Sequence, residues 1–285
     1  MDAKLDIRPS PIAGQWYPGD PKQLSMSVDE YIHEAKLPKL DGEVMGIITP
    51  HAGHLYSGPV AGYAFAALQG LKPELVAVIS PMHYPYNEPF LTTAHEAYET
   101  PLGILPVDKE AVQTLNDLLE DTLGYGLTSV RHDQEHSLEI ELPFLQRVIQ
   151  SKFKLLPVMV RDQSQRGTHI LGKCLAETLR ERNALLVAST DLSHFYPQEV
   201  ANELDEFMLG CIEDFNPEAV IKAEEEGRGF ACGRGALAAV LWAAKELGAN
   251  TVKILRHATS GDVTGDLSQV VGYGAAVILR RTETA

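Results

Sequence analysis

Five side chains that can bind a metal or transfer a proton lie in short turn-like motifs along this chain. They are His51, His83, Asp191, His194 and Cys232. Imidazole, carboxylate and thiol groups are the common protein ligands of transition metals, and histidine and aspartate also act as general acids and bases. The residue types therefore predict a metal-dependent active site, provided that the fold brings the five motifs together.

Three of these motifs follow apolar runs that stop at a turn. The runs are residues 44–49 before His51, residues 75–80 before His83, and residues 185–190 before Asp191. Continuous aliphatic and β-branched runs are typical of strands buried on both faces, as in a parallel sheet. Ligands of open α/β sheets bind at the carboxyl ends of such strands. We therefore expect these side chains at one edge of one sheet.

His51 and His83 are the predicted metal-binding pair. Neighbouring strands are about 4.8 Å apart, so two imidazoles at adjacent strand ends are close enough to share zinc or another transition metal. The alternative is structural, with each histidine hydrogen-bonding to a backbone carbonyl in its turn.

Cys232 lies in a glycine-rich segment, residues 229–235, directly before a predicted helix over 236–247. A thiol at a helix N-terminus beside Arg234 is favoured as the thiolate. It would then serve as a soft metal ligand or as a nucleophile. The alternative is a small buried apolar residue, which is also how we interpret Cys174 and Cys211.

Asp191 and His194 are three residues apart, and we predict that they are catalytic. Asp191 could orient His194 or accept a proton, and histidine titrates near neutral pH; the alternative is a structural Asx turn. His136, at the start of a predicted helix, is either a support for the site or part of a helix cap. Further residues expected to line the pocket or support its ligands are Trp16, His54, Tyr84, Arg234 and Asp262.

Composition limits the class of protein. The formal net charge is -15, and we find no basic stripe, which opposes nucleic-acid binding. Three cysteines without a CxxC motif indicate neither a disulfide framework nor a zinc ribbon. No apolar stretch approaches the roughly 20 residues of a membrane span. We therefore expect a cytoplasmic protein that acts on a small molecule, without nucleic-acid or membrane partners.

Strand and helix patterns alternate along the chain, which is typical of an α/β layer fold. Predicted helices cover residues 21–35, 58–68, 108–120, 135–151, 167–182, two segments within 199–226, and 236–247. Predicted strands cover residues 44–49, 75–80, 90–100, 103–107, 153–160, 185–190, 251–257 and 270–279. No linker-like segment divides them. We predict one domain over 1–285, with its core at about 8–279 and a central, largely parallel or mixed β-sheet flanked by helices.

Six motifs, in this order, resemble those of the Memo protein family. They are residues 13–18 (Ala-Gly-Gln-Trp-Tyr-Pro), 50–53 (Pro-His-Ala-Gly), 80–83 (Ser-Pro-Met-His), 135–139 (Glu-His-Ser-Leu-Glu), 191–194 (Asp-Leu-Ser-His) and 232–234 (Cys-Gly-Arg). The prokaryotic members are known as protein B of the AmmeMemoRadiSam system. The resemblance covers residues 8 to 279.

The resemblance implies a fold like that of class III extradiol (LigB-type) dioxygenases, which bind non-haem iron(II). It implies that His51, His83 and Cys232 are the metal ligands, beside Asp191 and His194, and that the metal is iron or copper. It also implies association with AMMECR1-like and radical SAM proteins. Those dioxygenases have a carboxylate where this chain has a thiol, and sulfur shifts the preference toward copper(I) or zinc.

Three functions follow as hypotheses from these residues. The first is a metal-dependent, dioxygenase-like oxidoreductase. The second is a non-catalytic metal- or partner-binding protein with a vestigial dioxygenase pocket. The third is a zinc-dependent hydrolase in which His194 is the general base.

Overall fold

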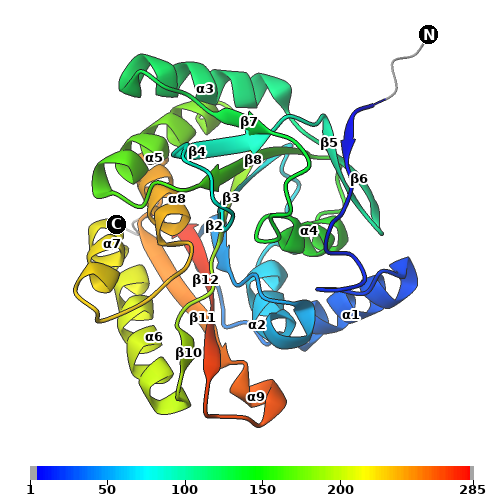
Figure 1. The fold of residues 1–285 in the computed structure, drawn as a ribbon, viewed down its shortest axis with the longest axis vertical. Helices are drawn as coiled ribbons and strands as arrows, with labels where there is room; N and C mark the ends of the chain where they lie inside the picture. The colour runs from blue at the N-terminus through cyan, green and yellow to red at the C-terminus, as the bar shows by residue number, and fades with distance from the viewer. Residues whose placement is uncertain (1–4, 283–285) are drawn as a thin grey trace.

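The apolar runs form the centre of a mixed sheet in the computed structural model, which describes residues 5–282 (Figure 1). Its central strands, in spatial order, are β2 (Glu43–Thr49), β9 (Ala184–Ser189), β3 (Leu75–Pro81) and β8 (Lys154–Val160). Each is parallel to its neighbour. Nearly all of their residues are buried, which explains why they are apolar without alternation.

Further strands, most of them antiparallel to their neighbours, extend the sheet on both sides. On one side β12 (Val270–Arg280) pairs with β2, and β10 (His194–Tyr196) and β11 (Thr251–Thr259) pair with β12. On the other side β4 (Phe90–Thr93) pairs antiparallel with β8 and parallel with β7 (Thr128–Val130). The strands β1 (Ile7–Arg8), β5 (Ala97–Thr100) and β6 (Gly103–Pro106) form a separate small sheet. The prediction of a largely parallel or mixed sheet is confirmed.

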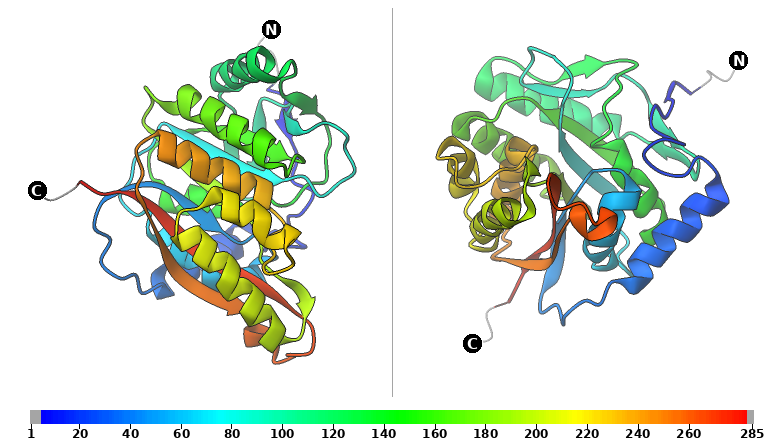
Figure 2. Two further views of the ribbon diagram at one scale, coloured as in Figure 1. Left: turned by 90° about the vertical axis from the view of Figure 1, so that its left-hand side faces the viewer. Right: turned by 60° about the horizontal axis from the view of Figure 1, so that its bottom comes forward.

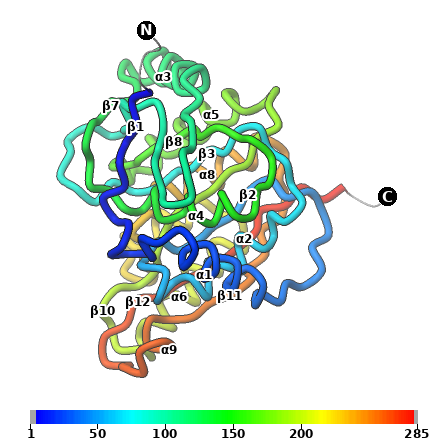
Figure 3. The backbone as a smooth tube through the Cα atoms, turned by 90° about the vertical axis from the view of Figure 1, so that its right-hand side faces the viewer, coloured from blue at the N-terminus to red at the C-terminus, as the bar shows by residue number. Residues whose placement is uncertain are grey.

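Helices cover both faces of the large sheet. One layer consists of α1 (Pro21–Glu34), α2 (His54–Ala66) and α4 (Leu142–Val148), which lie together in Figure 3. The other layer consists of α3 (Lys109–Leu123), α5 (Gln165–Leu179), α6 (Gln198–Glu213), α7 (Pro217–Glu225) and α8 (Arg234–Glu246) (Figures 1 and 2). The arrangement is the single α/β domain predicted from the sequence. Within residues 5–282 every helix is too short or too polar to traverse a lipid bilayer.

Several elements differ from the sequence prediction, and two of these differences involve predicted site residues. The helix expected over 135–151 is a 3-10 turn, η1 (Glu139–Glu141), followed by α4. Residues 135–138 stay outside it because the Glu135 carboxylate accepts hydrogen bonds from the His136 and Ser137 amides. The short strand β10 was not predicted, since it is only three residues long and two of these residues are exposed.

Candidate metal centre

The strand order places three of the predicted residues at one edge of the sheet. His51 follows β2, Asp191 follows β9 and His83 follows β3. The strands that carry His51 and His83 are not neighbours, because β9 lies between them. The two side chains still meet beyond the end of β9, with their ring centroids 5.2 Å apart.

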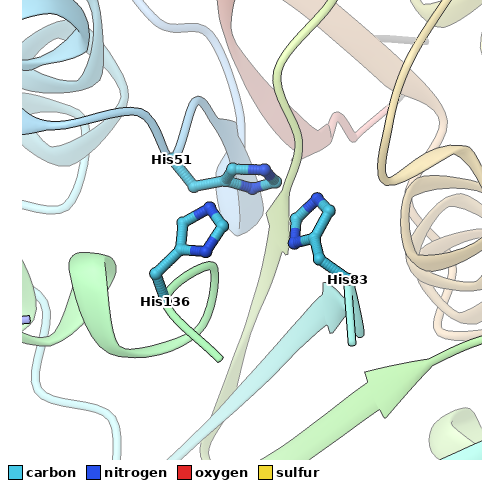
Figure 4. A group of neighbouring side chains, drawn as sticks. All are labelled: His51, His83 and His136. Atoms are coloured by element: carbon cyan, nitrogen blue, oxygen red, sulfur yellow. The ribbon is translucent and has the colours of Figure 1, made fainter. Parts of the chain in front are cut away.

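His136 is the third imidazole at this position. Its ring stacks on His83 at a centroid distance of 4.8 Å and lies edge-on to His51 at 5.4 Å. The three rings face one another in Figure 4. Ligand nitrogens of the three side chains all lie within 4.8 Å of one another, so the cluster could hold a metal ion. The sequence prediction placed His136 near the site but not among its ligands.

Hydrogen bonds fix which nitrogen of His51 is free. Its Nδ1 lies 2.9 Å from the hydroxyl of Ser189. That hydroxyl is also 2.7 Å from the Ser137 carbonyl and 2.7 Å from the carboxyl of Glu141. Because the hydroxyl donates its one hydrogen toward these oxygens, it accepts from His51 Nδ1–H. The lone pair of His51 is therefore on Nε2.

Glu135 orients the other two imidazoles. Its Oε1 lies 2.9 Å from His83 Nδ1 and 3.3 Å from His136 Nδ1, and its Oε2 accepts the His83 amide at 2.6 Å. Burial alone would raise the pKa of Glu135, but the hydrogen bond and charge of His83 lower it to about 2. An ionised carboxylate on Nδ1 leaves Nε2 of each ring available, as is usual for metal-binding histidines.

Two of the three rings, His51 and His136, are suited to metal binding because burial keeps them neutral. Burial lowers the pKa of His51 well below its usual value and lowers the pKa of His136 to about 4. A neutral imidazole has the lone pair that a metal requires, so neither ring has to lose a proton at neutral pH.

Cys232 lies beside the first of these histidines. Its Sγ is 3.1 Å from His51 Nε2 and accepts a hydrogen bond from the Asp191 amide at 3.3 Å. Burial, and then the Asp191 carboxylate, raise the pKa of the Cys232 thiol. The charge of Arg234 is directed into an ion pair with Glu224. The expectation that Arg234 lowers the thiol pKa is therefore wrong, and deprotonation of Cys232 requires another cation, such as a bound metal.

Asp191 and His194 do not form the pair predicted from the sequence. Asp191 Oδ1 accepts the amides of His51 at 2.7 Å and Ala52 at 3.3 Å, so it holds the loop that carries His51. Burial raises the pKa of Asp191 to about 7. His194 Nδ1 instead lies 2.8 Å from the Leu192 carbonyl. Leu192, rather than Asp191, orients the His194 ring.

The remaining lining candidates have different surroundings. Trp16 stacks on His136 at 4.0 Å and so borders the site, and Tyr84 is exposed beside His83. His54 is buried between Tyr17 and Phe144 and bonds to the Ile140 carbonyl, so it belongs to the core. Asp262 accepts the Thr259 amide and lines a separate groove. Arg234 pairs with Glu224, so the structure gives both side chains partners outside the three-histidine group.

Sequence reasoning missed the groups that orient the rings. Glu135, Ser189 and Glu141 are all buried, and each bonds to a site histidine or to a partner of one. Buried acids are rare unless they have partners. The one available signal was an acid, Glu141, inside an otherwise apolar segment over 140–145.

We expect Glu135→Gln to weaken metal binding about 10- to 100-fold, which is the usual effect of removing a carboxylate that holds a ligand histidine. A glutamine keeps the size of the side chain, but it removes the negative charge shared by His83 and His136. Competition with a chelator of known affinity measures the change. Glu96→Gln, a change at an acid that pairs with Lys109 and is not in the three-histidine group, is the control, and an equal affinity for both variants would contradict the role of Glu135.

Comparisons with known proteins agree with the sequence motifs. The family model described as "Memo-like protein" matches residues 8–277. A MEMO1 family protein of Nitrosopumilus maritimus is 36% identical over 94% of this chain and 98% of its own length. The MEMO1 family proteins of Methanococcoides burtonii and Thermotoga neapolitana are 35% and 36% identical, each over 95% of this chain and over 100% and 99% of their own lengths. The chain therefore belongs to the Memo family.

Proposed function

We propose that the protein is a non-haem, metal-dependent oxidoreductase whose ion is held by His51, His83 and Cys232, with His136 as an additional donor. The observation that carries the proposal is the orientation of the rings. Each has its Nδ1 near a fixed oxygen, which directs Nε2 away from that partner and toward the role of ligand. This arrangement is characteristic of histidines that bind metals.

Two sets of distances are compatible with metal ligation: those within the three-histidine group, which does not include Cys232, and the one between His51 and Cys232. A nitrogen and a sulfur bound tetrahedrally at about 2.0–2.1 Å and 2.3 Å are about 3.5 Å apart, and two nitrogens about 3.3 Å. His51 Nε2 and Cys232 Sγ are 3.1 Å apart, which is close to the first value. The nitrogens of the three histidines lie within 4.8 Å of one another. Small rotations of the rings would bring them to the separation expected for two nitrogens bound to one ion.

The residues of the chain would supply binding and proton transfer around that ion. Iron or copper, when bound, offers a Lewis acid and a one-electron redox couple. His194 bonds to the Leu192 carbonyl through Nδ1–H, which leaves its Nε2 as a proton acceptor. Burial lowers the pKa of His194, so this ring is a neutral base at neutral pH.

Zinc-dependent hydrolysis is the second candidate. Three clustered imidazoles are also the ligand set of some catalytic zinc sites, and the same His194 nitrogen would take the proton of water. Metal analysis of the purified protein separates the two: iron or copper supports the oxidoreductase, and zinc supports the hydrolase.

Cobalt(II) substitution tests the sulfur ligand. We expect the cobalt form to show a sulfur-to-metal charge-transfer band in the near ultraviolet, which Cys232→Ser abolishes because a hydroxyl replaces the thiolate. Cys211→Ser, a change at a buried cysteine in α6, is the matched control and should keep the band. A band that survives in Cys232→Ser would exclude Cys232, and its absence in His136→Ala would make His136 essential for the site.

A further inference from the structure

A cavity of about 670 Å³ is lined by residues that neighbour the candidate ligands rather than by the ligands themselves. Its lining includes Ala52 and Gly53, which directly follow His51, and Trp16, which stacks on His136. Phe195, which directly follows His194, lies on the same wall. Residues next to three different site motifs therefore build this one space, which places it where a molecule reaching the metal centre would rest.

Aromatic rings form much of the exposed wall. Trp16 is 36% exposed, Tyr56 in the first turn of α2 is 41% exposed, and Phe195 in β10 is 68% exposed. The right-hand view of Figure 2 brings α2 and the neighbouring helix α9 (Gly261–Thr264), which also contributes to the lining, to the front. Rings left in water offer apolar surface and flat faces to a bound ring.

The backbone of Phe195 indicates that its position is not set by packing. Its φ is 63°, in the left-handed region that favours glycine, yet the side chain is mostly exposed. A bulky residue in this region is strained. Strain of this kind persists at binding sites, where the placement of the side chain serves the ligand.

Charge on the wall selects against anions. Asp266 is the only charged side chain among the described residues that line the cavity. A carboxylate or phosphate in this space would meet no cationic side chain among the residues of its lining and would meet the like charge of Asp266, and an unpaired charge taken out of water is unfavourable. A neutral or positively charged ring meets neither obstacle.

We infer that this cavity is the substrate site and that it takes a flat aromatic compound without carboxylate or phosphate groups. The rings of Trp16, Tyr56 and Phe195 would hold it against the metal centre. Only the description of the bound compound as a substrate rests on the proposed function. The selectivity of binding belongs to the cavity and does not require a metal.

Three probes of one shape test the selectivity: benzyl alcohol is neutral, benzylamine is cationic and benzoate is anionic. Ligand-observed NMR with the full-length protein gives their affinities. We expect benzyl alcohol and benzylamine to bind, and benzoate to bind about tenfold more weakly or not at all. Benzoate binding as tightly as benzyl alcohol, or no binding of any probe at millimolar concentration, would overturn the inference.

Phe195→Gly tests the site itself. Glycine accepts a positive φ, so the thermal unfolding midpoint should stay the same or rise, while the affinity for benzyl alcohol falls about tenfold with the loss of one ring. Tyr196→Ala removes the next ring of β10, which is 42% exposed and outside the cavity, and should leave the affinity unchanged. A fall in the midpoint of Phe195→Gly, or unchanged affinity, would make Phe195 a structural residue and contradict the inference.

The same titrations on chelator-treated and metal-loaded protein separate the two proposals. Probe binding with the expected selectivity in a protein that takes up no metal would reject the proposed function and keep the cavity. Stoichiometric metal without selective probe binding would reject the inference about the cavity and keep the proposed function.

Discussion

The His51→Ala/His83→Ala variant is expected to lose bound metal to the background level of the buffer. The two changes remove two of the proposed ligands, including the Nε2 that lies beside Cys232 Sγ. Both residues follow strands rather than lie within them, so the sheet should remain. Elemental analysis measures the metal, and circular dichroism checks the fold.

The matched control is His33→Ala/His169→Ala, which removes two imidazoles away from the site. His33 is exposed on α1, and His169 packs on Trp242 in the opposite helix layer. This control should bind metal like the unaltered protein. Equal metal content in the two double variants would show that the bound ion is elsewhere.

Arg8→Ala is expected to lower the free energy of unfolding by about 3–5 kcal/mol, the usual effect of removing one partner from a buried ion pair. Arg8 is only 1% exposed. Its guanidinium lies 2.8 Å from Asp133 and 2.5 Å from Glu139. The alanine variant would leave these two carboxylates buried without their cation, which is more unfavourable than the loss of the contacts alone. Urea denaturation measures the change.

Arg147→Ala is the control for Arg8. Arg147 forms two hydrogen bonds with Asp29, at 2.7 Å and 2.6 Å, but both side chains are more than a third exposed. Exposed pairs of this kind contribute about 0–1 kcal/mol. A loss in Arg8→Ala no larger than that in Arg147→Ala would contradict the view that the buried network anchors the N-terminal strand β1 to the segment carrying Glu135 and His136.

Most of the fold could be predicted because it depends on local patterns. The runs at 44–49, 75–80, 153–160 and 185–190 are mostly apolar, and the structure buries most of their residues as expected. The spatial order of the strands could not be predicted in the same way. The placement of β9 between β2 and β3 depends on contacts between segments more than 100 residues apart in sequence.

The candidate site also contains residues that local sequence patterns could predict and residues that they could not. His51 and His83 were identifiable because each follows a buried strand. The role of Glu135 was not identifiable, since its bond to His83 spans 52 residues of sequence and its turn resembles a helix start. The pairing of Asp191 with His194 was wrong for a related reason: proximity in sequence suggested it, whereas the carboxylate reaches His51, 140 residues away.

X-ray absorption spectroscopy of the purified protein tests the central claim most directly. The proposed site predicts the edge of a first-row transition metal, with nitrogen neighbours at about 2.0–2.1 Å and one sulfur at about 2.3 Å, and the sulfur should disappear in Cys232→Ser. The absence of a metal edge above that of the buffer, or a shell of oxygen atoms alone, would contradict a metal centre built from His51, His83 and Cys232.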